Sequence, residues 1–315
     1  MKMKAFVLAA MLIAGGAQAE EVVRLGNLKF AHYGAVSYIK EIAPKCGIKV
    51  DEKVFPKGLD VMSAIIAGEL DVGATASEAA ISGRATGAPI YVVAGFAKGG
   101  ARLVAAKDSG IKSVKDLKGK KVGVTRGGIQ EVLLMAELQK SGMKPGDITP
   151  VYLAFADLNQ ALLGKQIDAM MQSEPQSSQA INKGYGAEVL KPYDTPIGEP
   201  VRTMVMTEKF YKEHRATAEK FMRCFVEATK TFIDQPAVAE KYVRETVFKG
   251  QITHDDFEDA IANSPYSYDV TPQHIQVTTD TMLKSGVGKM AKPPVATEWV
   301  KTDLLDAAKK GLGVK

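Results

Sequence analysis

The segment Thr125-Arg126-Gly127-Gly128 has the residue types of an anion-binding site. It follows a β-branched run and precedes Ile129 and Gln130, which open a stretch with helical spacing. A glycine turn at a helix start leaves backbone N–H groups unpaired at the positive end of the helix dipole, and these groups favour an anion. Arg126 adds a forked donor that suits a carboxylate, sulfonate or phosphate. The alternative is that the glycines only allow a tight turn while Arg126 points to solvent.

Two Ser-Glu pairs, Ser77-Glu78 and Ser173-Glu174, each follow a predicted strand and precede a helical pattern. Serine is a common N-cap, and Glu and Pro suit the first turn of a helix, so helix capping is the favoured role for each pair. Both pairs would also line a cleft, because ligands of open α/β sheets bind at the carboxyl ends of the strands. The two carboxylates would suit a ligand that carries an amine or amide, although they could equally face away.

A loop rich in polar and aromatic residues follows the first predicted strand. Asn27, Lys29 and Phe30 occupy it, with His32 and Tyr33 next along the chain. These aromatic rings could stack on a planar ligand. The favoured interpretation is that they pack the following helix against its sheet.

Three more residues are candidates for the cleft because of their places near strand ends. Phe155 follows a predicted strand and could form a wall. Arg202 is a second cationic candidate, with Glu199 close by as a possible neutralising partner. Lys98 ends another strand, where solvation and ligand contact are equally expected.

The sequence carries no recognisable catalytic, nucleotide or metal motif. The patterns G-x-S-x-G, G-x-x-x-x-G-K-[ST], G-x-G-x-x-G, C-x-x-C and H-E-x-x-H are all absent, and the four histidines are scattered. We therefore predict a protein that is not an enzyme and needs no cofactor or metal.

The N-terminal residues indicate an exported protein. Residues 1–19 place Lys2 and Lys4 before a short apolar run that ends near Ala17-Gln18-Ala19, the layout of a secretory signal. We expect cleavage after Ala19 and free residence in the periplasm.

The net charge of the mature chain is small. Removal of Lys2 and Lys4 with the signal peptide changes the formal net charge from +5 to 5 − 2 = +3. Lys and Arg are scattered along the chain, which argues against nucleic acid as a partner.

The two cysteines, Cys46 and Cys224, could pair in an oxidising compartment. Nothing in their spacing requires a bridge, since a disulfide depends on distances that a sequence does not give. Two separately buried thiols are the favoured prediction.

Short apolar or β-branched runs alternate with helical patterns from Glu20 to about Lys191, which is typical of parallel sheets covered by helices. The predicted strands are Val22–Gly26, Lys49–Phe55, Val72–Ala76, Ile90–Ala97, Lys121–Thr125, Val151–Ala154, Ala169–Gln172 and Glu188–Leu190. Helical patterns dominate beyond about Thr207. The predicted helices there are Ala216–Ile233, Ala237–Val247, Asp255–Asn263, Thr271–Leu283 and Glu298–Lys310.

An internal repeat relates two parts of the chain at an offset of 97 positions. At this offset Ala64–Asp71 lies over Ala161–Asp168, and Val54-Phe55 lies over Val151-Tyr152. A strand, a helix, a turn and a second strand thus recur in the same order. The repeat predicts two similarly built α/β lobes that face each other across a cleft.

The chain is expected to cross between these lobes twice, near Leu103–Lys107 and near Arg202–Met206. Two crossings form a hinge that can close on a ligand. The division that follows is a signal peptide (1–19), lobe 1 (20–104 and the mainly helical 204–315) and lobe 2 (105–203).

Four segments have a family pattern when they are taken together: Phe55-Pro56-Lys57-Gly58, Ala67–Gly73, Lys107–Val124 and Ser173-Glu174-Pro175. They resemble the nitrate/sulfonate/taurine family of periplasmic substrate-binding proteins. The likeness runs from about Val22 to Phe210. The resemblance implies an α/β, two-lobed type II periplasmic binding protein fold, in which each lobe is a mostly parallel sheet flanked by helices, with extra C-terminal helices.

The resemblance also implies a function. A monomer would bind a small organic anion in the cleft and deliver it to an ABC permease in the inner membrane. Ligand contacts would come from the loop Asn27 to Phe30, from Ser77-Glu78, from Arg126 to Gln130 and from Ser173-Glu174-Pro175.

One departure from the family pattern concerns the ligand. Family members often have an aromatic residue beside the acidic-Pro pair, whereas this chain has Gln172-Ser173 before Glu174 and Gln176 after Pro175. This difference favours a larger or more polar anion than nitrate or a simple alkanesulfonate. The alternative function is a carrier of, or an enzyme acting on, a heterocyclic or aromatic acid compound, because relatives with this fold serve thiamine-pyrimidine and menaquinone-precursor chemistry. The predicted signal peptide argues against a cytosolic biosynthetic enzyme.

Overall fold

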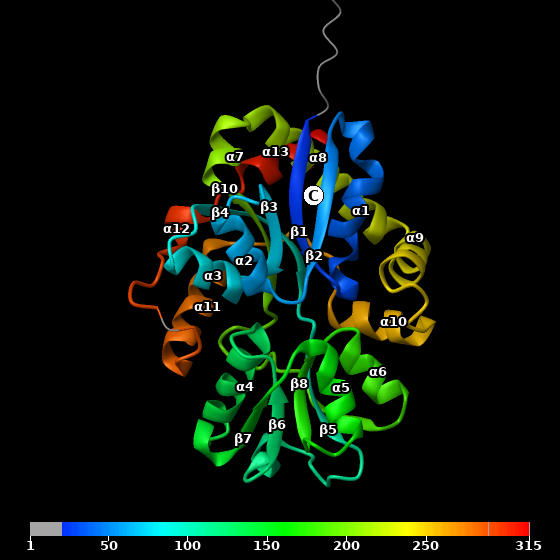
Figure 1. Cartoon of the computed structure of the whole chain (residues 1–315), viewed down its shortest axis with the longest axis vertical. Coiled ribbons are helices and arrows are strands. Elements are labelled where there is room, and N and C mark those ends of the chain that lie inside the picture. The colour runs from blue at the N-terminus through cyan, green and yellow to red at the C-terminus, as the bar shows by residue number, and fades with distance from the viewer. Residues whose placement is uncertain (1–20, 289, 315) are drawn as a thin grey trace, which may run out of the picture.

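Two lobes stacked along the long axis make up the protein (Figure 1). The computed structural model describes residues 21–288 and 290–314, so the predicted signal peptide and its cleavage site after Ala19 lie outside the described residues. Each lobe contains a five-stranded sheet covered by helices. No helix of the described chain combines the length and apolar character that a membrane crossing requires.

The sheet of lobe 1 is mixed. Its strand order is β2 (Lys49–Phe55), β1 (Val22–Leu28), β3 (Val72–Ala76), β10 (Val201–Thr207) and β4 (Ile90–Lys98). Strand β1 pairs in parallel with β2 and β3, whereas β10 is antiparallel to both β3 and β4. The helices that follow these strands are α1 (Gly34–Ile42), α2 (Gly58–Ile66) and α3 (Ser77–Ala85), with short 3-10 turns at Ala31–Tyr33 (η1) and Ala43–Cys46 (η2).

The sheet of lobe 2 has the same design. Its strand order is β7 (Thr149–Tyr152), β6 (Lys121–Val124), β8 (Ala169–Ser173), β5 (Ala101–Ala106) and β9 (Gly186–Leu190). Strand β6 is parallel to β7 and β8, and β5 is antiparallel to β8 and β9. Its helices are α4 (Ile129–Lys140), α5 (Phe155–Leu163) and α6 (Gln176–Asn182), with 3-10 turns at Val114–Leu117 and Pro145–Asp147.

The predicted internal repeat is present in the structure. Adding 97 to the bounds of β3 gives those of β8, and adding 97 to the bounds of α2 gives those of α5. Asp71 and Asp168 are related by the same offset and make the same kind of hydrogen bond. Each carboxylate accepts the backbone N–H at a neighbouring strand, from Arg24 at 3.0 Å and from Lys121 at 2.8 Å.

Both crossings between the lobes differ from the predicted ones. Leu103–Lys107 and Arg202–Met206 were expected to be connections, but β5 and β10 lie inside the sheets of lobes 2 and 1. The chain crosses at Gly99-Gly100 and again between Leu190 and Val201, several residues earlier in each case. Both strands are buried along almost their whole length, so they lack the regular alternation of polar and apolar residues that marks a half-exposed strand.

The C-terminal third is helical and mostly covers lobe 1 (Figure 1). Its elements are α7 (Glu208–Glu213), α8 (Arg215–Asp234), α9 (Pro236–Lys241), the π-helical η5 (Tyr242–Val247), α10 (His254–Asn263), α11 (Pro272–Ser285), α12 (Ala296–Trp299) and α13 (Asp303–Gly311). Helix α10 contacts α6, and α11 contacts α4, so this region also touches lobe 2. The predicted single helix Glu298–Lys310 is wrong, because Val300 leaves the helix to form a β-bridge with Val92.

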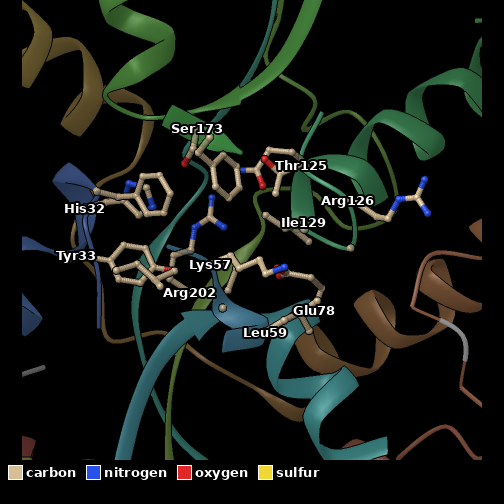
Figure 2. A pocket seen from close by; sticks show the side chains of 18 residues that line it. His32, Tyr33, Lys57, Leu59, Glu78, Thr125, Arg126, Ile129, Ser173 and Arg202 are labelled. Atoms are coloured by element: carbon tan, nitrogen blue, oxygen red, sulfur yellow. The ribbon is translucent and has the colours of Figure 1, made fainter. Parts of the chain in front are cut away.

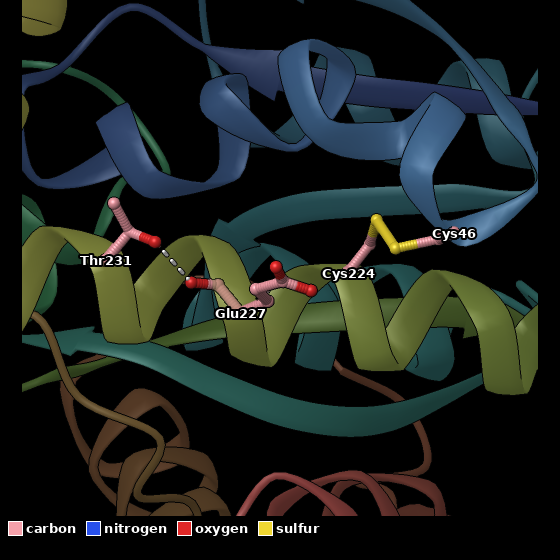
Figure 3. Close-up of a disulfide and its surroundings, with 4 residues drawn as sticks. All are labelled: Cys46, Cys224, Glu227 and Thr231. Carbon is pink, nitrogen blue, oxygen red and sulfur yellow. Dashed lines mark hydrogen bonds between the residues drawn. A yellow bond between two sulfur atoms is a disulfide. The ribbon is translucent and has the colours of Figure 1, made fainter.

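The two cysteines form a disulfide, so the prediction of two separate thiols is wrong (Figure 3). Cys46 ends η2 and Cys224 lies on α8, with 6.1 Å between their Cα atoms. This distance suits a bridge, and only the fold could supply it. The bond ties the N-terminal part of lobe 1 to its C-terminal helices.

Candidate functional site

A narrow cavity lies between the two lobes (Figure 2). Lobe 1 forms one wall from the residues after β1, the start of α2, the start of α3 and β10, and lobe 2 forms the other from the β6–α4 turn and the start of α5. The lining residues are Leu28, Phe30, His32, Tyr33, Lys57, Gly58, Leu59, Ala76, Glu78, Thr125, Arg126, Gly127, Gly128, Ile129, Gln130, Phe155, Ser173 and Arg202.

Arg202 brings a buried guanidinium group into this cavity. The side chain is 2% exposed and points toward the centre of the cavity in Figure 2. One Nη donates a hydrogen bond to the carbonyl oxygen of Gly99 at 2.5 Å, while Nε has no hydrogen-bond partner within the described chain. A buried cation with a free donor is costly unless an anion meets it. The cavity therefore has a binding group for an acid.

Gly100, at the first crossing, allows the backbone to pass close to this guanidinium. Its φ is +78°, a conformation that favours glycine. A Cβ atom there would lie 3.0 Å from His32 Cε1 and 3.1 Å from Arg202 Nη2. The glycine thus leaves room for two cavity side chains at this crossing.

Glu78 is a second buried charge on the lobe 1 side. It lies at the start of α3 and is 5% exposed, and its Oε2 atom has no hydrogen-bond partner among the described residues. Burial raises the pKa of Glu78 to about 7, and the positive charge of Arg202 and backbone N–H groups, including that of Ile129, oppose the rise. The carboxyl group is therefore divided between its charged and neutral forms near pH 7.

His32 contributes a neutral imidazole. It is 0% exposed, and neither ring nitrogen has a hydrogen-bond partner in the described structure. Burial, with a smaller contribution from the positive charge of Arg202, lowers the pKa of His32 well below its usual range. The ring can therefore offer one N–H donor and one nitrogen acceptor to a ligand at neutral pH.

Aromatic rings from both lobes form the apolar wall. Phe30 of lobe 1 meets Phe155 of lobe 2 edge to face, with 5.2 Å between the ring centroids. Phe30 also packs against Tyr33 and His32. This cage suits an apolar or planar body on a bound molecule.

The predicted anion-binding turn from Arg126 to Gln130 lines the cavity, but the guanidinium of Arg126 does not point into it. Gly127 has a φ of +74°, and a Cβ atom there would lie 3.2 Å from Leu59 of the opposite lobe. The guanidinium of Arg126 instead lies 3.9 Å above the ring of Tyr152, away from the cavity centre (Figure 2). The Gly127 N–H donates to Glu131 of the same helix at 2.6 Å.

Two predicted contact residues in the first loop lie outside the lining. Strand β1 extends to Leu28, so Asn27 is a strand residue whose Nδ2 donates to Glu52 at 2.7 Å. Lys29 points away, with its Nζ donating to Gln251 at 3.1 Å. Neither residue lines the cavity.

The two Ser-Glu pairs do not cap their helices as predicted. Helix α3 begins at Ser77 itself with Ala76 as N-cap, and Ser173 ends β8 and donates to the carbonyl oxygen of Gly100 at 3.2 Å. Glu174 is fully buried outside the cavity lining, where it forms an ion pair with Arg102 at 2.8 Å. In lobe 1 the helix begins one residue too early for Ser77 to cap it, and in lobe 2 the strand includes Ser173 and the helix begins only at Gln176.

The family of the chain follows from a match to a family model described as NMT1/THI5 like, which covers residues 44–239. The chain belongs to this family. A relative from Escherichia coli (strain K12), named for binding aliphatic sulfonates, is 34% identical over 174 residues, which are 55% of this chain and 52% of the relative. A relative from Brachyspira hyodysenteriae, named as an ABC transporter periplasmic binding protein, is 22% identical over 252 residues, 74% and 72% of the two chains.

The solved structures that this NMT1/THI5-like protein resembles confirm its predicted fold class. The alkanesulfonate-binding protein of Xanthomonas axonopodis pv. citri, solved with MOPS bound, superposes with a TM-score of 0.77 at 20% identity over 90% of this chain and 99% of the other. The nitrate-binding protein of Synechocystis PCC 6803 gives 0.75 at 16% identity over 94% and 90%. The chain spans about half the length of the first curated relatives it matches. The resemblance stated from the sequence is confirmed by these matches.

Sequence reasoning found part of the cavity of this NMT1/THI5-like protein and missed part. Lys57, Gly58 and Leu59 line it but were not chosen. They follow the end of β2, which is the same positional signal that selected Phe155 after β7. Applied to every strand of the repeat, that signal would have found them.

Proposed function

We propose that this protein is the solute-binding component of an ABC importer and captures a small organic anion between its two lobes. One observation carries the proposal: the guanidinium of Arg202 is buried in the interlobe cavity with its Nε unpaired in the described structure. An acid group would satisfy this cation. The relative named for binding aliphatic sulfonates and the relative named as an ABC transporter periplasmic binding protein support the same function.

The ligand would be an organic rather than an inorganic anion. The aromatic wall of Phe30 and Phe155 offers apolar area that nitrate or sulfate cannot use. Because these two rings touch across the lobes, an organic anion enters only when the lobes separate, which fits a hinge at the two crossings. The ligand-bound protein would then deliver its ligand to a permease in the inner membrane.

The setting of this function is also proposed. The protein would be exported by residues 1–19, act in the periplasm as a monomer and perform no catalysis. Delivery to a permease requires nothing more than release when the lobes open.

The test has two parts. Mass spectrometry of ligand released from freshly purified, unrefolded protein identifies its natural cargo, and calorimetric titration with alkanesulfonates, aromatic sulfonates, carboxylates and nitrate ranks the classes. We expect an organic acid bound one to one, with a smaller radius of gyration in small-angle scattering when it is bound. A neutral natural ligand, or binding without compaction, would contradict the proposal.

A further inference from the structure

Glu78 and Glu174 occupy corresponding places in the two lobes but have different environments. Each is the acidic member of a Ser-Glu pair at the end of a repeated strand, β3 or β8. Both carboxylate oxygens of Glu174 have partners. The carboxylate forms an ion pair with Arg102 at 2.8 Å and accepts hydrogen bonds from Asn263 Nδ2 at 2.8 Å and Ser178 Oγ at 2.7 Å. It is a structural residue.

Glu78 has no such set of partners. It is 5% exposed and lines the cavity, and its Oε2 atom is unpaired in the described structure. Backbone N–H groups, including that of Ile129, bond to the carboxyl group, but they replace only part of the hydration that burial removes, and Oε2 stays without a partner in the described structure. The carboxyl's raised pKa, about 7, has the same cause. A ligand that supplied a hydrogen-bond donor would remove this cost.

The other charged and titratable groups around Glu78 do not supply that donor. Arg202 on β10 donates to Gly99 and keeps Nε unpaired, and His32 on η1 is neutral with both nitrogens unpaired. The phenol of Tyr33 lies in the same wall, and the Lys57 ammonium before α2 lies 3.9 Å from Asp60. The cavity therefore contains a carboxyl acceptor, Glu78, and a guanidinium donor, Arg202, each with one atom that has no hydrogen-bond partner in the described structure.

We propose that Glu78 is a specificity-determining residue that accepts a hydrogen bond from an amine, amide or hydroxyl group of the ligand, so that the site selects compounds carrying such a donor together with the acid group held by Arg202. This inference rests on the proposed anion-binding function. It narrows the cargo from organic anions in general to bifunctional acids. Simple anions of the same size are disfavoured because they leave the Glu78 carboxyl unpaired.

The experiment compares acids that differ only in the donor. The probes are 2-aminoethanesulfonate and ethanesulfonate, 3-aminopropanesulfonate and propanesulfonate, and 4-aminobenzoate and benzoate, each titrated calorimetrically into the wild-type protein, Glu78→Gln and Glu69→Gln. Glu69 is an exposed acid of the same lobe that pairs with Lys53, so its variant controls for the loss of one negative charge. Melting temperatures confirm that the variants are folded.

We expect the amino member of at least one pair to bind the wild-type protein about tenfold or more tightly than its partner, since a charge-assisted hydrogen bond has that strength. Glu78→Gln should lose most of this preference, and Glu69→Gln should keep it. If the acids without a donor bind wild-type protein as tightly as those with one, the inference is overturned while anion binding stands. If no probe binds, anion binding itself fails and the inference falls with it. Should Glu78→Gln not fold, the comparison within pairs on the wild-type protein still decides.

Discussion

Replacing Arg202 by glutamine tests which arginine holds the acid group. The guanidinium is 2% exposed and its Nε is unpaired, so a ligand acid would make at least one charge-assisted hydrogen bond in a dry site. Such a bond contributes about 1.5–3 kcal/mol, which corresponds to a loss of roughly 10- to 150-fold in affinity. Glutamine ends where the Arg202 Nε lies and is too short to reach the Gly99 carbonyl, so the variant loses this hydrogen bond, and its unfolding free energy should fall by about 1 kcal/mol while the protein stays folded.

Arg126→Gln is the matched control. Its guanidinium stacks on Tyr152 at the mouth of the cavity, and the change should alter affinity less than about threefold. Both variants are titrated calorimetrically with the acid that binds the wild-type protein most tightly, and urea unfolding reports their stability. A larger loss in Arg126→Gln than in Arg202→Gln would refute the reasoning. It would mean that Arg126 leaves Tyr152 on binding and that the turn before α4 holds the acid group.

Three further predictions concern stability. The pKa of Glu78 in the folded protein is about 7, which is above its ordinary value of 4.5. The free energy of unfolding should therefore fall as the pH rises from 4.5 to about 7. The melting temperature of Glu78→Gln should therefore rise relative to the wild type between pH 5 and pH 8, by the equivalent of about 3 kcal/mol, and a constant difference would contradict this. Reducing the Cys46–Cys224 bond, which spans 178 residues, should lower the free energy of unfolding by about 5 kcal/mol in urea titrations, and equal midpoints with and without reductant would refute it. Glu174→Gln should destabilise the protein by about 2 kcal/mol or more because it removes the fully buried counter-charge of Arg102 and leaves that guanidinium only the more exposed Glu188 at 3.1 Å, while calorimetric affinity for acids stays within about threefold.

Local sequence patterns predicted the elements that are bounded by clear signals. Strands β2 and β3 were placed with their observed bounds, and α4 ends where Lys140 precedes Gly142, as expected. The 97-residue repeat predicted the paired lobes. These features depend on residue type and spacing along a short stretch, which the sequence shows directly.

Features that depend on tertiary contacts were not predictable in the same way. The two antiparallel strands β5 and β10 were taken for connections, because a fully buried strand has no polar face to mark it. The direction of Arg126 depends on the ring of Tyr152, and the burial of Arg202 depends on the placement of β10 between β3 and β4. The disulfide depends on α8 returning to η2 from 178 residues away.

The path of the chain through the two sheets has a consequence for how the protein is made. Lobe 2 is one uninterrupted segment from β5 to β9, so all its strands are available once residue 190 has emerged. Lobe 1 is discontinuous: its sheet lacks an inner strand until β10 arrives, and its disulfide cannot close before Cys224 is present. During synthesis or export from the N-terminus, the later segment would therefore mature first. Until β10 arrives, β3 keeps one edge unpaired and β4 has no neighbour in the sheet, which makes these two strands the part of the nascent chain most dependent on protection from aggregation.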